Sequence, residues 1–403
     1  MENFFNIKLY LPEITIFLGS LLCIVIGAFS NKRKYNKVYI FSLVTLLISS
    51  CFILFSDVSL KESSNIFANT SFTNAVKLFV IGISIAILYV SHGYIKNNKL
   101  NLFEYPILLL FAVLGMLLMV SANDLLLLYV SIELQSLSLY VLVALNRDSL
   151  KSSEAALKYF ILGSIASAII LYGISMTYSI TGSTNYNVIS NFIFNQNNFL
   201  LSSFGLILIL SGLAFKLSAA PFHMWTPDVY EGAPSSVTTI LITLPKIVVL
   251  VALIKLLNKP FFFFESLWQQ IIITITILSI AIGSIAALRQ ENIKRLFAYG
   301  TIANIGYVLI GIACLEQEAV QSSLLYMFVY TFGALGVFSF IMILRRDDTQ
   351  LVNVSDIADH TVFISDWLKN LFITYGFGDS NHSVIRNGAN KEFFNFYSLP
   401  DNL

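Results

Sequence analysis

Residues 201–232 read LSSFGLILILSGLAFKLSAAPFHMWTPDVYEG, a long apolar run that continues into a segment with two prolines. One straight helix over it would be about 48 Å long at about 1.5 Å per residue, which exceeds a bilayer core of about 30 Å. Pro221 and Pro227 each remove a backbone donor and clash with the preceding turn. The sequence therefore predicts a helix that breaks near residues 217–221, just after Lys216, and then restarts or bends. Broken helices at membrane depth are tolerated only around a cavity or a buried site.

The composition of the whole chain agrees with a membrane protein. Of its 403 residues, 57% are hydrophobic and only 12% are charged, whereas soluble domains carry about 25% charged residues. Long apolar runs recur almost end to end, which favours an all-α polytopic fold over the short alternating strands of a β-barrel. No basic patch with interleaved aromatic residues indicates nucleic-acid binding.

The apolar runs predict about eleven membrane-spanning helices. A very short turn at Asn123 and Asp124 separates the fourth from the fifth. The expected spans are 11–30, 38–56, 73–94, 104–121, 123–145, 155–181, 201–220, 234–257, 268–288, 295–314 and 320–344.

Lysine and arginine gather in alternate connections between these spans. The positive-inside rule places that set of connections on the cytoplasmic or matrix side, with the N-terminus outside. The connection that carries Asp228 and Glu231 is the exception, because it has no basic residue. The basic residues of the set are Lys32, Arg33, Lys34, Lys37, Lys96, Lys99, Arg147, Lys151, Arg289, Lys294, Arg295, Arg345 and Arg346.

Three ionisable side chains fall well inside apolar segments. Glu133 lies midway through YVSIELQSLSLYVLVAL at residues 129–145, on one helical face with Ser136 and Tyr140. Lys216 precedes the predicted break, and Lys246 lies deep in the following span, next to a proline. A charge at the bilayer centre costs about 3 kcal/mol or more, so such groups face a bundle interior, a partner or water. We interpret the three as a path for protons or ions.

Other polar residues are weaker candidates. His223 lies beside the break, where it could relay protons or simply cap the break. Lys158 and Glu154 are one turn apart, which favours a surface ion pair. Lys77 and Glu13 fall near the ends of their spans, so we expect them at the interface.

Motifs for cofactor chemistry are missing from the sequence. It contains no GxxxxGK[ST] phosphate loop, no HExxH metal motif and no GxGxxG after a strand. The three cysteines have neither metal-ligand nor redox spacing. We therefore expect no cofactor and no metal on this chain.

At these residues the chain resembles a known family. YVSIELQSLSLYVLVAL, ALKYFILGSIASAIILYGIS, GLAFKLSAAPFHMWTPDVYEGAPSSVT and LPKIVVL are similar to subunit N of bacterial NADH-quinone oxidoreductase, the counterpart of mitochondrial NADH dehydrogenase subunit 2. That subunit is one of the antiporter-like subunits of respiratory complex I. The resemblance covers about residues 10–359.

The resemblance implies a fold and a role. It implies two inverted five-helix repeats with a broken helix in each. Glu133 would pair with Lys216, and Lys246 would lead toward the second half-channel. The chain would move protons while partner subunits carry NADH, FMN, iron–sulfur clusters and quinone. The implied partners are the other membrane subunits of complex I, in the bacterial inner membrane or, alternatively, the mitochondrial inner membrane.

The resemblance also suggests domain boundaries. We expect three N-terminal spans at 1–103, a first repeat at 104–257, a partial second repeat at 258–359 and an atypical polar tail at 360–403. The family has fourteen spans, so we expect a truncation or frameshift near residue 359. Residues 362–375 could form an interfacial amphipathic helix.

Two further interpretations remain open from sequence. The chain could be a truncated, non-pumping remnant or structural subunit of the complex. It could instead be a subunit of a multisubunit sodium/proton antiporter.

Overall fold

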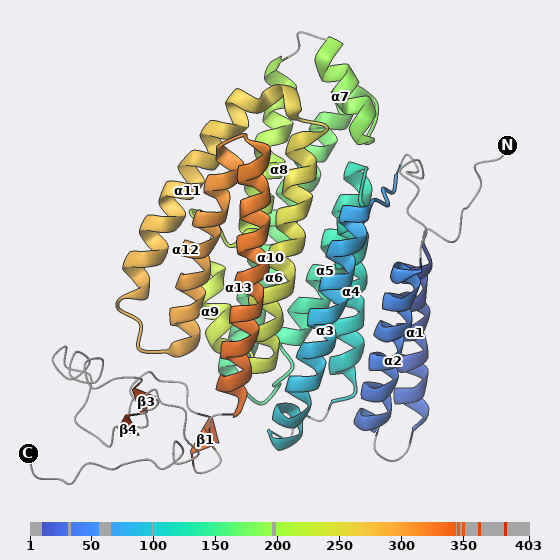
Figure 1. The fold of residues 1–403 in the computed structure, drawn as a ribbon, viewed down its shortest axis with the longest axis vertical. Helices are drawn as coiled ribbons and strands as arrows, with labels where there is room; N and C mark the ends of the chain where they lie inside the picture. Colours follow the sequence, from blue (N-terminus) through green and yellow to red (C-terminus); the bar gives the residue numbers. More distant parts are fainter. Residues whose placement is uncertain are drawn as a thin grey trace, which may run out of the picture.

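The computed structural model describes residues 10–30, 34–55, 66–98, 100, 102–195 and 199–343, together with four two-residue strands. The described part is almost entirely helical (Figure 1). The elements are α1 Leu11–Phe29, α2 Lys34–Leu54, α3 Ser71–Asn97, α4 Glu104–Ser121, α5 Leu125–Val143, α6 Leu150–Thr181, α7 Tyr186–Asn195, α8 Phe199–Leu217, α9 Trp225–Gly232, α10 Ser235–Asn258, η2 Phe262–Phe264, α11 Glu265–Ala287, α12 Ile293–Ala313, α13 Gln317–Ile343, β1 Arg345–Arg346, β2 Thr349–Gln350, β3 Val362–Phe363 and β4 Ser383–Val384.

The described helices form a bundle of the expected class. Ten of them are long and apolar enough to cross a membrane, and α8 adds a shorter apolar helix at 203–217. These correspond to the eleven segments predicted from sequence. The short helix α7 was not predicted, since it lies in a stretch interpreted as a loop. In Figure 1 the long helices run side by side, and α1 and α2 form one edge of the bundle.

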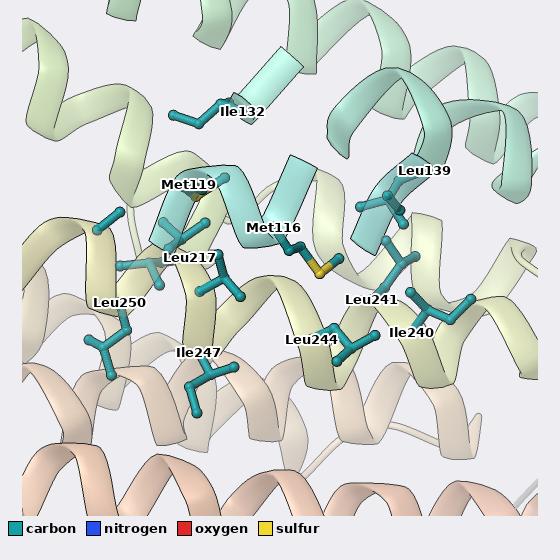
Figure 2. Packing of buried hydrophobic residues seen from close by; sticks show 14 of the residues in the cluster. Met116, Met119, Ile132, Leu139, Leu217, Ile240, Leu241, Leu244, Ile247 and Leu250 are labelled. Carbon is teal, nitrogen blue, oxygen red and sulfur yellow. The ribbon is translucent and has the colours of Figure 1, made fainter. Parts of the chain in front are cut away.

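Helix α10 lies at the centre of the bundle. It contacts α3, α4, α5, α8, α12 and α13, and 94% of its most apolar window is buried. Figure 2 shows Met116 of α4 near Leu241 and Leu244 of α10, within one cluster of buried apolar side chains. This packing excludes water and lipid from the helix that carries Lys246, so any polar group there must find its partners inside the protein.

The predicted break is confirmed. Helix α8 ends at Leu217, Ser218 has a positive φ of 65°, and α9 begins at Trp225. Between them the chain passes Pro221, which cannot donate a helical hydrogen bond. A helix end leaves backbone carbonyls without donors, and the Trp225 indole Nε1 donates to the Phe215 carbonyl at 3.0 Å. A side chain just after the break therefore donates to one of the carbonyls near the end of α8.

The last part of the chain is described only at its short strands. β1 pairs with β2 in antiparallel fashion, and β3 pairs with β4 in parallel. Apart from β3 and β4, the tail at 360–403 and the amphipathic helix expected at 362–375 lie outside the described residues.

The expectation that Glu13 and Lys77 lie at the interface was wrong. Helix α1 places Glu13 and helix α3 places Lys77 inside the bundle, where they are 4% and 1% exposed. The Lys77 Nζ lies 2.7 Å from Glu13 Oε1 and 4.7 Å from the centre of the Phe67 ring. Position along a span says little about which way a side chain faces, and here the opposite charge lies on a helix distant in sequence.

Candidate functional site

Lys216 lies in the last turn of α8 and reaches across to α5. Its Nζ donates to the Ser136 hydroxyl at 2.7 Å and to the Tyr140 hydroxyl at 3.3 Å, and it lies 5.7 Å from the centre of the Tyr140 ring. The side chain is buried. The polar face predicted for α5 therefore points at the lysine of the broken helix.

A glycine makes room for this contact. Gly163 on α6 faces the ring and hydroxyl of Tyr140, and a Cβ at this position would overlap them. Tyr140 also packs edge-on against Tyr159 of α6, with ring centres 4.7 Å apart. The Tyr140 hydroxyl is one of the two partners of the Lys216 amine, and its position depends on how closely α5 approaches α6.

Glu133 lies on the same helix but does not contact the lysine. Its Oε1 is buried and has no hydrogen-bond partner within the described residues. Glu133 lies close enough to Lys216 to act on it electrostatically, yet the described contacts include no ion pair between them. The structure thus places the expected carboxylate beside the site, with the amine held by hydroxyl groups instead.

Lys246 is fully buried in α10 and faces the break in α8. Its Nζ donates to the Lys216 carbonyl at 3.0 Å and to the Ser218 hydroxyl. It also lies 5.0 Å from the centre of the Trp225 ring, within the range of a cation–π interaction. The backbone oxygens freed where α8 ends therefore form part of the binding site for the second lysine.

The turn of α10 before Lys246 is arranged around Pro245. A proline there leaves the Leu241 carbonyl without its helical donor, and the Tyr230 hydroxyl of α9 donates to that carbonyl at 3.1 Å. The Thr243 hydroxyl donates to the Thr239 carbonyl at 2.6 Å. Neighbouring hydroxyl groups therefore donate to the carbonyl oxygens of this turn.

His223 lies in the connection between α8 and α9. Its side chain is 8% exposed, and its Nδ1 has no hydrogen-bond partner among the described residues. Its backbone carbonyl accepts from the Thr226 amide at 2.9 Å. The described hydrogen bonds do not join its side chain to Lys216 or Lys246.

The exceptional carboxylates of the sequence have cationic partners in the structure. Arg295 at the start of α12 bridges Asp228 at 2.9 Å and Glu231 at 3.0 Å. Lys158 of α6 contacts Asp228 at 2.9 Å and Glu154 at 2.8 Å. These groups are partly exposed, so each ion pair contributes only modestly to the stability of the fold. Together they join α9 to α6 and α12.

Several site residues were not found from sequence. Ser218 and Trp225 became partners of Lys246 only because the break turns the chain back toward α10. Trp225, between Pro221 and Pro227, was the available signal, because a ring face is a suitable neighbour for a buried cation. No group of three or more metal-ligating side chains occurs within the residues that the structure describes.

The fold and these buried amines define a class, the antiporter-like membrane subunits. A family model described as "NADH:quinone oxidoreductase/Mrp antiporter, TM" matches residues 122–371. The chain is 40% identical over 354 residues to NADH-quinone oxidoreductase subunit N 1 of Rhizobium meliloti, covering 88% of this chain and 74% of that protein. It is also 40% identical over 379 residues to subunit N of Pelagibacter ubique, covering 92% and 79%.

Solved structures agree. A chain of respiratory complex I from Thermus thermophilus aligns with a TM-score of 0.69 and 26% identity, over 85% of this chain and 72% of that one. A chain of the Mrp complex from Dietzia aligns with the same TM-score of 0.69 at 16% identity, over 83% and 64%, which shows a shared fold. The chain belongs to the family of NADH-quinone oxidoreductase subunit N.

Proposed function

We propose that this chain is a proton-translocating membrane-arm subunit of an NADH:quinone oxidoreductase in the bacterial inner membrane. The subunit N relatives and the complex I neighbour support this assignment. NADH oxidation and quinone reduction would take place on partner subunits, which would also carry the flavin and the iron–sulfur clusters. This chain would contribute the movement of protons.

One observation carries the proposal. A continuous set of buried contacts runs from Ser136 and Tyr140 on α5, through Lys216 on α8, to Lys246 on α10. It passes through the point where α8 is broken. Two buried amines joined by oxygen atoms across three helices have no evident structural purpose, since neither has a carboxylate partner in the described contacts.

The physical link between the two amines is their mutual repulsion. Two unit charges about 8 Å apart interact by about 2 kcal/mol at an effective dielectric of about 20, which is about a thirtyfold change in a protonation equilibrium. A proton arriving on Lys216 would thus favour release from Lys246. The same coupling would let a charge change elsewhere in the complex move a proton here.

The proposed roles follow from the positions. Glu133 would set the charge near Lys216, Lys216 would receive the proton, and Lys246 would pass it toward the second half of the molecule. His223, buried beside the break, is a weaker candidate for a relay. We propose residues 104–257 as the unit that carries this half-channel, preceded by three spans at 1–103 and followed by a partial second repeat at 258–359.

The test is complementation of a bacterial strain that lacks its own subunit N. We expect the chain to restore assembly of the complex and NADH-driven proton pumping. Glu133→Ala and Lys216→Ala should each reduce pumping by tenfold or more, which corresponds to about 1.4 kcal/mol. Glu291→Ala, which removes an exposed carboxylate, is the matched control and should pump normally.

The same experiment separates the alternatives. Assembly without pumping would favour a structural, non-pumping subunit and overturn the proposal. A second candidate is cation/proton exchange, which the shared fold with the Mrp chain makes reasonable. Pumping that requires sodium would favour exchange, whereas pumping that is unchanged without sodium would support proton translocation.

A further inference from the structure

A cavity of about 510 Å³ lies away from the lysine site, between α1, α4, α5 and the start of α6. Its walls are apolar and include Ile24, Ile107, Phe111 and Val141. Three polar residues complete the lining, and all three come from the end of the bundle where α4 and α6 begin and α5 has ended. They are Glu104, Arg147 and Ser153.

Among the described residues, the two charged residues of this cavity form no ion pair. Glu104 has one carboxylate oxygen, Oε2, that is buried and accepts no hydrogen bond within the described residues. Arg147 is exposed and makes no ion pair with any described side chain. Buried polar atoms in native proteins are nearly always paired. The cavity therefore presents one buried acceptor, Glu104 Oε2, without a donor among the described residues, and an exposed cation, Arg147, at its mouth.

The charged end of this cavity is expected at the level of the membrane surface. The α3–α4 and α5–α6 connections belong to the set enriched in lysine and arginine, which the positive-inside rule places on the cytoplasmic side. Lys34, at the start of α2, lies 5.9 Å from the centre of the Phe103 ring, and Phe103 lines the cavity. The charged mouth would then lie at the level of lipid headgroups and the apolar walls at the level of acyl chains.

We propose that this cavity binds a glycerophospholipid whose headgroup carries a primary amine, of the phosphatidylethanolamine class. The ammonium group would donate to Glu104, the phosphate would pair with Arg147, and an acyl chain would fill the apolar chamber. The unpaired Glu104 oxygen distinguishes this occupant from an anionic lipid, because an ammonium group can donate to that oxygen and an additional negative charge cannot. Hydrogen bonding selects phosphatidylethanolamine over phosphatidylcholine, because the quaternary ammonium of phosphatidylcholine has no N–H to donate.

The test is native mass spectrometry of the purified full chain, titrated with phosphatidylethanolamine, phosphatidylglycerol and phosphatidylcholine of identical acyl chains. We expect phosphatidylethanolamine to bind most tightly. Arg147→Gln and Glu104→Gln should each weaken it about fivefold, since one charge near the membrane surface contributes about 1 kcal/mol. Arg289→Gln and Glu291→Gln, which remove exposed charges from another connection, are the matched controls and should bind normally.

Two further measurements separate recognition of the lipid headgroup from recognition of its acyl chains. Glycerophosphoethanolamine, which has no acyl chains, should not compete, because the apolar chamber would stay empty. Ala144→Phe, which narrows the chamber, should weaken binding of all three lipids. Equal binding of the three lipids, tighter binding of phosphatidylglycerol, or unchanged binding by Glu104→Gln would overturn the proposal.

Discussion

Glu13 with Lys77 and Lys216 with Lys246 are two buried charged sites in one helical bundle, and they are built differently. The first joins a carboxylate of α1 to an amine of α3 at 2.7 Å. The second holds two amines by hydroxyl and carbonyl oxygens and aromatic rings. All four side chains are almost completely buried, so burial alone does not separate them.

The difference lies in how the charge is balanced. An ammonium beside a carboxylate forms a neutral pair that can remain unchanged in an apolar interior. Two amines with no carboxylate in direct contact among the described residues carry a net charge that depends on how many protons they hold. The comparison teaches that a matched buried pair supports the fold, whereas an unmatched one is suited to exchanging protons.

The largest expected effect is on the matched pair. Lys77→Met should leave Glu13 as a buried carboxylate without its partner and destabilise the protein by about 3–5 kcal/mol. The midpoint of thermal unfolding of the purified chain measures this loss. The double variant Glu13→Leu with Lys77→Met should recover most of the stability, because replacing both partners removes the unpaired charge. A double variant no more stable than Lys77→Met would show that the pair does not act as a neutral unit.

The next effect should appear at the unmatched site. Lys246→Met should lower NADH-driven proton pumping by tenfold or more, about 1.4 kcal/mol, while the complex still assembles. The reason is that the methionine keeps the volume of the chain but carries no proton, and the Lys216 carbonyl loses a donor. Pumping is measured in vesicles against the amount of assembled complex. Normal pumping by this variant would contradict the distinction between the two sites.

A smaller effect should come from the helix contact that positions Lys216. Gly163→Ala should displace the Tyr140 hydroxyl and reduce pumping about fivefold, as expected for about 1 kcal/mol of overpacking. Gly300→Ala is the matched control, since open space surrounds that glycine on α12. Equal pumping by the two variants would show that the Tyr140 contact does not matter for Lys216.

Much of the fold could be predicted from local sequence. The apolar runs located the long helices, and Pro221 located the break because proline cannot continue a helix. The helix α7 escaped prediction because it is only ten residues long and contains three asparagines, which have low helix propensity. At the candidate site, the shared face of Ser136 and Tyr140 followed from helical spacing, and both side chains contact Lys216.

Local sequence alone predicted an all-α membrane protein, the number of its apolar segments and the positions of Lys216 and Lys246 inside them. These depend on hydrophobicity and helical period, which are local properties. Only the tertiary structure decided which charges meet: Lys77 with Glu13, Lys246 with the end of α8, and Arg295 with the carboxylates of α9. The physical reason is that partners for buried charges come from helices distant in sequence, and packing alone sets which faces of those helices touch.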